Sequence, residues 1–291
     1  MSNTFHDGQF LADVAAGLAE TDMGLAALIY RDVATEFVTG RGDTVSIRIP
    51  GVTTTSTRPV GSTADYEVGE IVEQLLPVTL TTEAYSVVPI SLAESTLDVK
   101  SYAKQVLKPQ TMTVAHHIET VTAAAFAATP KDAGIAYSAT YPRAAVIHAR
   151  AALRARGVSA DASIRAVAGA TVYADMLLAD ALDDQGTIAG IKVTESSAIP
   201  VGALYVFVPE AFVAAIRAPE PPEGATVAAS ATTAGMALTH MRAFNGANGT
   251  TNSIVTTFVG VAPMPLPVAD YENGVVNLVA NGGIVSIDTT P

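Results

Sequence analysis

The side chains that could support acid–base or metal chemistry are few, and their spacing does not bring them together. The histidines are His6, His116, His117, His148 and His240. His116 and His117 are adjacent, so on a helix they point roughly 100° apart and do not easily share a metal ion. The chain has no cysteine, which excludes disulfides, thiolate catalysis and cysteine metal sites. Because the usual nucleophile, phosphate-loop, dinucleotide and zinc-protease motifs are also missing, we predict no catalytic residue, no cofactor and no metal.

Three other short patterns are better explained by structure than by chemistry. Asp175 and Asp180 lie five residues apart, off a shared helical face, and 183–184 follow a predicted helix end, so solvated positions are favoured over a metal site. The tripeptide at 41–43, Arg-Gly-Asp, is typical of a turn before a strand as well as of receptor-binding loops. The acceptor pattern at 248–250, Asn-Gly-Thr, is interpreted as a hairpin tip rather than a glycosylation site.

One arrangement of charges could support binding between subunits. The acidic set is Asp65, Glu67, Glu70 and Glu73, and the basic set is Lys100, Lys104 and Lys108. The three lysines recur every four residues, so on a helix they form one stripe. The two sets are either unrelated solvated faces, or the acidic segment of one subunit lies over the helix of its neighbour. Each exposed pair would contribute only roughly 0.2–1 kcal/mol, so the pairs would set register more than strength.

The acidic set lies in a segment, residues 41–90, that is predicted to be an extended hairpin loop. Residues 44–49 are apolar at every second position, which is typical of a strand with one buried face. Residues 78–88 alternate in the same way, with a slip near Glu83 that suggests a bulge. The intervening residues cannot form a core of their own, and a long two-stranded arm is marginal alone in water. We therefore predict a chain that packs against copies of itself.

The basic set lies in the longest predicted helix, residues 96–128. Asp98 is its expected N-cap. Apolar residues recur at three- and four-residue spacing from Tyr102 to Phe126. Pro109 lies inside this pattern, so we expect a kink or a restart there. Residues 8–38, which precede the hairpin loop, are mostly apolar and predict a helical or mixed arm.

The rest of the chain alternates helix and strand signals. Helices are predicted at 142–156 and 171–182 and as a short one from Pro209, and strands at 164–168, 191–194, 204–208, 236–242, 253–259, 275–279 and 284–287. Pro142 and Gly157 bound the first of these helices. The segment 219–224 is rich in proline and is expected to be a stiff loop. The fold class is therefore α+β.

The composition suggests a chain whose surface is covered by partners. Hydrophobic residues make up 49% of it and charged residues only 15%. The net charge is −12, and residues 1–97 hold 13 acids and 4 bases, or −9 of that total. An acidic protein is a poor general binder of nucleic acid. The chain has no apolar run of 18 residues, and its start does not resemble a signal peptide, so we expect no membrane association.

The order of these parts resembles that of tailed-bacteriophage major capsid proteins of the Hong Kong 97-type fold. Four strings also resemble the subgroup that includes the coat of the Salmonella podophage type. They are 37–45 (FVTGRGDTV), 101–109 (SYAKQVLKP), 190–196 (GIKVTES) followed by Ile199-Pro200, and 253–260 (SIVTTFVG). The resemblance covers about residues 10–265, and the order and spacing of the strings carry it.

The resemblance implies a division of the chain into domains. The expected parts are an N-terminal arm (1–40), an extended hairpin loop (41–90), a peripheral domain with a spine helix (91–135 and 225–265), an axial domain (136–224) and a C-terminal segment (266–291). The loop would clasp a neighbouring subunit, and the axial domain would cluster around five- and six-fold axes. Some relatives join subunits covalently through a lysine on this loop, but residues 41–90 contain no lysine.

The resemblance also implies a function. We expect a non-enzymatic major capsid protein that self-assembles into the icosahedral shell around double-stranded phage DNA. Its partners would be copies of itself in hexamers and pentamers, a separate scaffolding protein and a portal, with room for a decoration protein. It would be assembled in the host bacterial cytoplasm and would reside in the virion. The alternatives are an encapsulin-like compartment shell and an uncharacterised hydrolase.

Overall fold

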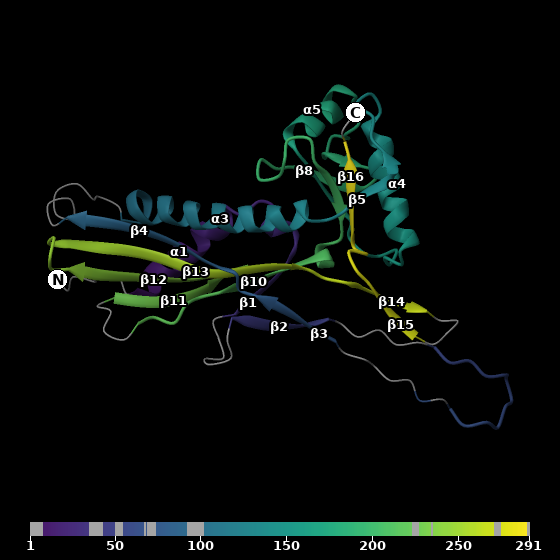
Figure 1. The fold of residues 1–291 in the computed structure, drawn as a ribbon, viewed down its shortest axis with the longest axis horizontal. Coiled ribbons are helices and arrows are strands. Elements are labelled where there is room, and N and C mark those ends of the chain that lie inside the picture. The colour runs from purple at the N-terminus through teal and green to yellow at the C-terminus, as the bar shows by residue number, and fades with distance from the viewer. Residues whose placement is uncertain are drawn as a thin grey trace. The chain divides into compact units, whose positions relative to one another are not determined.

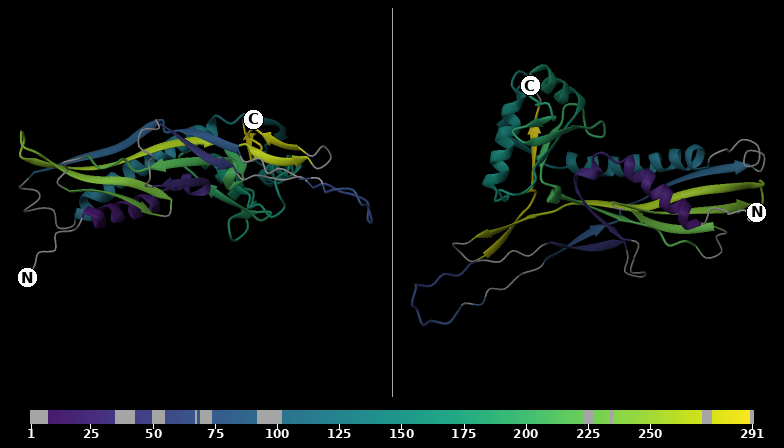
Figure 2. Two further views of the ribbon diagram at one scale, coloured as in Figure 1. Left: turned by 90° about the horizontal axis from the view of Figure 1, so that it is seen from below. Right: turned by 180° about the vertical axis from the view of Figure 1, so that it is seen from behind.

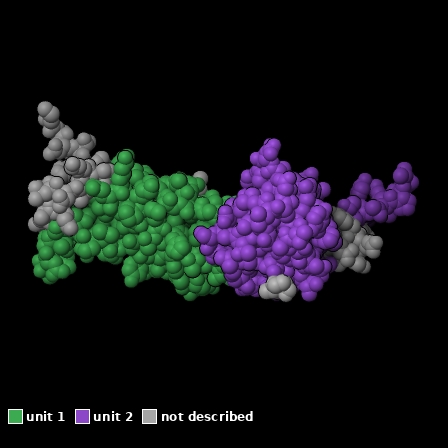
Figure 3. Space-filling view, turned by 90° about the horizontal axis from the view of Figure 1, so that it is seen from above, with its two compact units in different colours: residues 1–45, 78–124, 213–261 green, residues 46–77, 125–212, 262–291 purple. Residues whose placement is uncertain are grey.

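The computed structural model of the chain describes residues 8–34, 43–49, 55–66, 68, 74–91, 102–222, 227–233, 235–270 and 275–289. The chain divides into two compact units, coloured separately in Figure 3. Unit 1 comprises 1–45, 78–124 and 213–261, and unit 2 comprises 46–77, 125–212 and 262–291. Within the described ranges, every helix is too short or too polar to cross a membrane.

A six-stranded sheet runs through unit 1 (Figure 1). Its strands are β1 (Tyr30–Ala34), β4 (Thr82–Ser91), β10 (Phe212–Arg217), β11 (Val227–Thr233), β12 (Met236–Asn245) and β13 (Thr250–Pro263). The order is β1-β10-β13-β12-β11, and β4 pairs with β13 in addition. β1 is parallel to β10, whereas β11, β12, β13 and β4 are joined by antiparallel pairings. Segments far apart in the sequence therefore build one sheet.

Two helices cover strands of this sheet. Helix α1 (Gly8–Thr21) packs against β11 and β12 through buried alanines, which allow a close approach. The spine helix, α3 (Lys108–Ala127), follows a five-residue π-helical segment, η2 (Ala103–Leu107). Pro109 has no N–H to offer the carbonyl group four residues earlier, which explains why the regular pattern is interrupted here. The expected disturbance at Pro109 is thus confirmed, as a π segment.

A buried carboxylate ties the spine helix to the segment that follows α1. Glu119 of α3 is only 7% exposed. Its Oε1 accepts hydrogen bonds from the backbone N–H groups of Gly24 and Ala26 at 2.9 Å, and its Oε2 accepts one from Leu25 at 2.7 Å. These donors lie at the start of the short 3₁₀ helix η1 (Ala26–Leu28), where backbone N–H groups have no partner within the helix.

Unit 2 contains a second six-stranded sheet, in the order β5-β16-β9-β6-β8-β7. Its strands are β5 (Lys131–Ala136), β6 (Arg165–Ala168), β7 (Thr187–Ile188), β8 (Ile191–Glu195), β9 (Leu204–Phe207) and β16 (Ile284–Asp288). Helix α4 (Pro142–Ala155) packs on β16, β9 and β5, and helix α5 (Ala170–Leu178) connects β6 with the loop before β7. Gly169 before α5 is required, because a Cβ there would lie 2.2 Å from the carbonyl oxygen of Pro200.

The core of unit 2 is centred on Phe126, at the end of the spine helix. Its ring centroid lies 4.5 Å from that of Phe212, 4.9 Å from that of Phe207 and 5.3 Å from that of Tyr205. Phe126, Phe207 and Phe212 are fully buried. The last residues of α3 therefore belong to the core of unit 2, on β9 and the start of β10.

Two further strand pairs complete the described structure. β2 (Thr44–Ile49) pairs with β3 (Gln74–Thr79), and β14 (Leu266–Asp270) pairs with β15 (Val275–Val279). The right panel of Figure 2 shows both pairs clearly.

Most elements with a clear local pattern are confirmed. The helix predicted at 142–156 is α4, and the strands predicted at 44–49, 275–279 and 284–287 are β2, β15 and β16. The longest helix is confirmed from residue 102 to 127, while its expected N-cap, Asp98, lies outside the described residues. The two later strands around the Asn-Gly turn are confirmed and longer than predicted.

Three element predictions are wrong in type or extent. The residues after Pro209 form a three-residue 3₁₀ turn and then strand β10, because Phe212–Arg217 is buried on both faces of a sheet. The run predicted as one strand at 78–88 belongs to two strands, β3 and β4, with a break at 80–81 instead of a bulge at Glu83. The helix predicted at 171–182 ends at Leu178.

Candidate assembly surfaces

The described part of the extended loop between β2 and β3, residues 55–66, has a turn of its own and is almost fully exposed. Residues 55–66 are exposed except for Ser62, which is half-buried. The N–H of Ser62 donates to the carbonyl of Pro59 at 3.1 Å, and Gly61 has φ +86°, as position i+2 of a type II turn requires. The Arg58 guanidinium lies 3.8 Å above the Tyr66 ring and donates to the Ala64 carbonyl. Residues 55–66 thus have local order and are open to a partner (Figure 2).

The acidic set falls only partly within the described residues. Asp65 lies on the extended loop and is exposed. Glu67, Glu70 and Glu73 lie outside the described residues, as do Lys100 and the first two residues of the Arg-Gly-Asp tripeptide.

The two described lysines of the basic set share one exposed face. Lys104 lies in the π segment and Lys108 at the start of α3, and both are exposed. The exposed positions continue along α3 through Met112, His116 and Thr120 at intervals of four residues. The helix therefore offers a continuous outer stripe with its positive charge at the N-terminal end. The pairing of this stripe with the acidic loop of another copy stays a prediction.

A chain of polar side chains fixes the start of the spine helix on the sheet. The Tyr102 hydroxyl donates to Ser253 Oγ at 2.6 Å, and Ser253 Oγ donates to Gln110 Oε1 at 2.8 Å. His240 Nε2 lies 3.1 Å from the Tyr102 oxygen. Because the Tyr102 proton is already used, the arrangement is satisfied when Nε2 of His240 carries the proton and donates. Gln110 Nε2 also donates to the carbonyls of Ser86 and Ser253.

The burial of this network changes how its groups titrate. Removal from water lowers the pKa of His240 from 6.5 to about 4, and the positive charge of Arg242 adds to the effect. Burial also raises the pKa of Tyr102, against the opposing effects of Ser253 and Arg242. His240 Nδ1 is buried and has no hydrogen-bond partner. A proton on this atom would therefore be unsatisfied, so the histidine is neutral at pH 7.

Strand β4 presents a second uncovered surface in unit 1. His117 of α3 lies 3.3 Å from the Thr82 hydroxyl, which places the even-numbered side chains of β4 toward the helix. The odd-numbered ones, including Tyr85 and Val87, point away and are exposed. An exposed aromatic and an exposed aliphatic residue on one strand face are suited to contact with another subunit.

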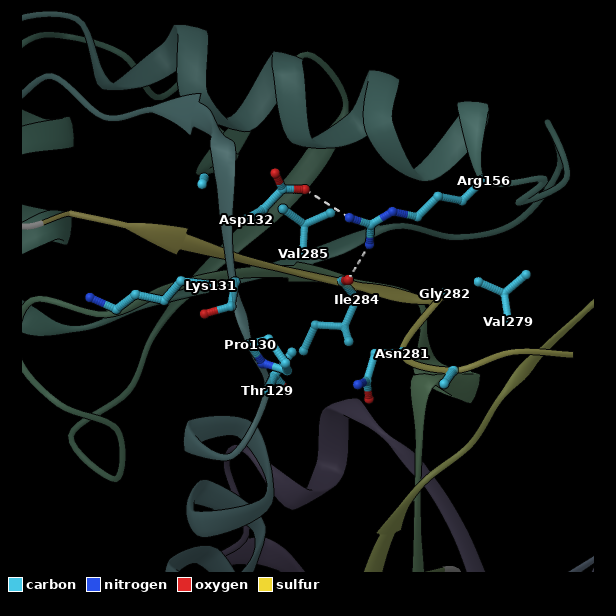
Figure 4. Close-up of a pocket in the computed structure, with 13 residues that line it drawn as sticks. Thr129, Pro130, Lys131, Asp132, Arg156, Val279, Asn281, Gly282, Ile284 and Val285 are labelled. Carbon is cyan, nitrogen blue, oxygen red and sulfur yellow. Dashed lines mark hydrogen bonds and ion pairs between the residues drawn. The ribbon is translucent and has the colours of Figure 1, made fainter.

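A pocket of about 380 Å³ in unit 2 is lined in part by polar side chains. Figure 4 shows Arg156 and Asp132 on one wall and Thr129 and Asn281 on the other. Arg156 pairs with the Asp132 carboxylate at 2.7 Å and donates to the Ile284 carbonyl at 2.7 Å. Through these two contacts Arg156, at the end of α4, is joined to β5 and β16. The pocket has no nucleophile with an adjacent base, so it does not resemble a catalytic centre.

The other chemically suggestive residues stay apart. Among the described residues, no group of three His, Asp or Glu side chains could hold a metal ion. Asp183 accepts hydrogen bonds from the backbone of Gln185 and Thr187 and from the Thr187 hydroxyl, and these bonds lower its pKa. It therefore shapes a turn. Asn248 and Gly249 lie in the β12–β13 turn.

Sequence reasoning missed the features that depend on tertiary structure. The only local signal for the stacking of Arg58 on Tyr66 was Gly61, which favours the turn between them. No local signal in the sequence predicted that Glu119 accepts hydrogen bonds from residues 24–26, or that Tyr85 and Val87 are exposed.

The comparisons with known proteins identify the fold. No protein-family model and no curated protein matches the chain. Among solved structures, the capsid of Ralstonia phage GP4 matches with a TM-score of 0.59 at 12% identity, over 91% of this chain and 88% of that one. The mature capsid of bacteriophage PhiM1 matches with a TM-score of 0.54 at 12% identity, over 91% and 86%. A virus-like particle from Pyrococcus furiosus matches with a TM-score of 0.52 at 10% identity, over 96% and 97%. The chain therefore has the Hong Kong 97-type capsid fold.

Proposed function

We propose that this chain is a major capsid protein, many copies of which form an icosahedral shell around double-stranded phage DNA. The observation that supports this most is that the fold is shared with phage capsids over nine-tenths of the chain. The open loop at 55–66 and the uncovered face of β4 are surfaces that a lone subunit leaves without partners.

The proposal includes the domain roles and partners expected from the sequence. The loop of one subunit lies over the spine helix of its neighbour, the segment 136–224 faces the five- and six-fold axes, and a separate scaffolding protein and a portal assist assembly in the host cytoplasm. The acidic balance, −12 overall, keeps the shell from adhering to the DNA that it encloses.

Sedimentation velocity of the purified chain over a wide concentration range tests this function. We expect closed particles of many megadaltons, with electron microscopy showing icosahedral shells. Phage particles containing the chain should protect double-stranded DNA from nuclease. A small fixed oligomer at every concentration, with or without co-expressed phage assembly proteins, would contradict the proposal and favour the hydrolase alternative.

A compartment shell of the same fold is the second candidate. The match to the virus-like particle from Pyrococcus furiosus, which covers 97% of that chain, supports a particle-forming role that is not tied to a phage. Particles that enclose a cargo enzyme and no DNA would identify this function instead.

Reversing the two described lysines tests the pairing of loop and helix. Lys104→Glu with Lys108→Glu should reduce assembly at low salt and shift the remaining particles toward irregular forms, because like charges would then face each other. The effect should be modest, since exposed pairs contribute roughly 0.2–1 kcal/mol each, and should fade at high salt. Particle yield by sedimentation at two ionic strengths measures it.

A matched control changes both side chains but keeps their charge. Lys104→Arg with Lys108→Arg should assemble like the wild type at both ionic strengths, since both positions are exposed. Normal assembly of the lysine variant at low salt would rule out the pairing.

A further inference from the structure

Helix α5 ends in two leucine side chains, Leu177 and Leu178, that no other described part of unit 2 covers. Leu178 is 87% exposed and Leu177 is 59% exposed. The helix ends just beyond them, where Asp180 adopts φ +50°. The Asp180 N–H donates to the Leu177 carbonyl, and the Ala181 N–H donates to the Met176 carbonyl. This is a Schellman arrangement, and Ala181 and Met176 are buried beneath it. The Schellman arrangement therefore fixes the end of the helix so that Leu177 and Leu178 face solvent.

Negatively charged residues lie close to these two leucines in the sequence. Residues 166–191 contain four aspartates and no lysine or arginine, and Lys192, the next residue, offsets the charge of Asp183. Asp175 accepts a hydrogen bond from Tyr137, and Asp183 is used by its own turn. Asp180 and Asp184 are exposed, and the described structure gives their carboxylates no hydrogen bond or ion pair. The α5 end is thus apolar at its centre and acidic at its margin.

The outer face of helix α4 has the complementary character. Tyr141, at its N-cap, is 65% exposed, and Ile147 is 40% exposed. Residues 142–155 contain three arginines and no acid, although the chain as a whole is strongly acidic. Arg143 is exposed with no ion pair among the described residues, and Arg150 is exposed and donates to the Ala189 carbonyl. This face is apolar at its centre and basic at its margin.

We propose that the α5 end of one copy docks on the outer face of α4 of the next copy. Leu177 and Leu178 would pack on Tyr141 and Ile147, and Asp180 or Asp184 would lie near Arg143. The two surfaces differ, so the contact is head-to-tail, and such contacts close into rings when the rotation between copies allows it. The inference rests on the proposed function and adds to it the residues that would join subunits around a ring.

A second copy fits the α4 face better than nucleic acid does. Phosphate groups would satisfy the arginines, but they would leave the exposed leucines of α5 and the isoleucine of α4 in water. The acidic apolar surface that complements α4 is present on every copy of the chain. Burying two leucine side chains would strengthen the contact by about tenfold or more.

Cysteine pairing tests the contact directly, because the chain has no cysteine of its own. The double variant Leu178→Cys with Ile147→Cys should give, on mild oxidation, a ladder of disulfide-linked multimers on a non-reducing gel. Each single variant should give almost none, since a head-to-tail contact does not bring two copies of one position together. Ile147→Cys with Val201→Cys is the matched control, because Val201 is similarly exposed in unit 2 but lies outside both surfaces.

Charge exchange gives a second test with an unusual outcome. Arg143→Asp and Asp180→Arg should each lower ring formation several-fold at low salt, and the two changes in one chain should restore it. A mixture of the two single variants should also restore it, but only as alternating rings. Alternating rings need an even number of subunits, so hexamers should form and pentamers should not.

The outcomes separate this inference from the proposed function. Wild-type shells together with no ladder would overturn the α4–α5 contact and leave the shell function intact. A ladder in concentrated solution, with no shell even when phage assembly proteins are co-expressed, would support the contact and contradict the shell function. Loss of protected nucleic acid from the Arg143→Asp variant, with rings unchanged, would assign the α4 face to nucleic acid and overturn the inference.

Discussion

Replacing Glu119 with alanine should lower the free energy of unfolding by roughly 3–5 kcal/mol. The Glu119 carboxylate accepts three backbone hydrogen bonds from 24–26 and is almost fully buried. Alanine would leave the N–H groups of Leu25 and Ala26 buried without a partner, each at a cost of about 1–3 kcal/mol, whereas water can reach that of the exposed Gly24. Small domains are stable by only about 5–15 kcal/mol in total, so the loss would be a large share.

Glutamine at the same position should cost about half as much as alanine. Its amide oxygen can keep the bonds that Oε1 receives from Gly24 and Ala26, whereas its NH₂ group would face the N–H of Leu25. Urea unfolding of the unassembled chain measures both variants. Amide hydrogen exchange at residues 24–26 should become much faster in the alanine variant.

Glu195→Ala is the control for these variants, because Glu195 is exposed and the described structure gives its side chain no partner. An alanine variant of Glu119 with the same urea midpoint as this control would show that the carboxylate does not hold the segment after α1. It would also show that the hydrogen bonds between that segment and the spine helix do not contribute to stability.

How far sequence reasoning succeeded depended on whether the signal was local. Helix α4 is bounded by Pro142 at its first turn and by Gly157 just beyond its end, and its ends were predicted to within a residue. The run after Pro209 had no such signals. A short apolar segment does not distinguish a buried strand from a buried helix, and the structure made it strand β10.

Sheet partners could not be predicted, because they depend on contacts between distant segments. β16, near the C-terminus, lies between β5 and β9, in the interior of the unit 2 sheet. Glu119 meets its donors across more than 90 residues of sequence. The same reason applies to the candidate surfaces. The charges of the loop and of the lysine stripe are visible in sequence, whereas the exposure of Leu178 depends on what the fold leaves uncovered.

Acid should weaken unit 1 through His240, by roughly 3 kcal/mol between neutral pH and pH 4. The pKa of this histidine is about 4 in the folded chain and 6.5 in its ordinary state. Because the folded pKa is the lower one, the unfolded chain takes up a proton first as the pH falls. The stabilisation is therefore complete above pH 6.5, declines as the pH falls through the window from 6.5 to about 4, and does not decline further below it.

Replacing His240 with glutamine should remove this component of the pH dependence. The glutamine amide can still donate toward the Tyr102 oxygen, so the contact between the spine helix and β12 is partly retained at pH 7. Carboxylates also titrate in this window, but they are the same in both proteins. The difference in unfolding free energy between wild type and variant therefore isolates the histidine, and it should shrink by roughly 3 kcal/mol from pH 7 to pH 4.

The matched control is His148→Gln, since His148 is exposed on α4. If the difference between wild type and His240→Gln were constant from pH 7 to pH 4, His240 would not be held neutral by burial. The proton assignment along His240, Tyr102, Ser253 and Gln110 would then also be wrong, because it depends on a neutral ring with Nδ1 unprotonated. A pH-dependent difference would instead show that the start of the spine helix is fixed by a network that tolerates no added charge.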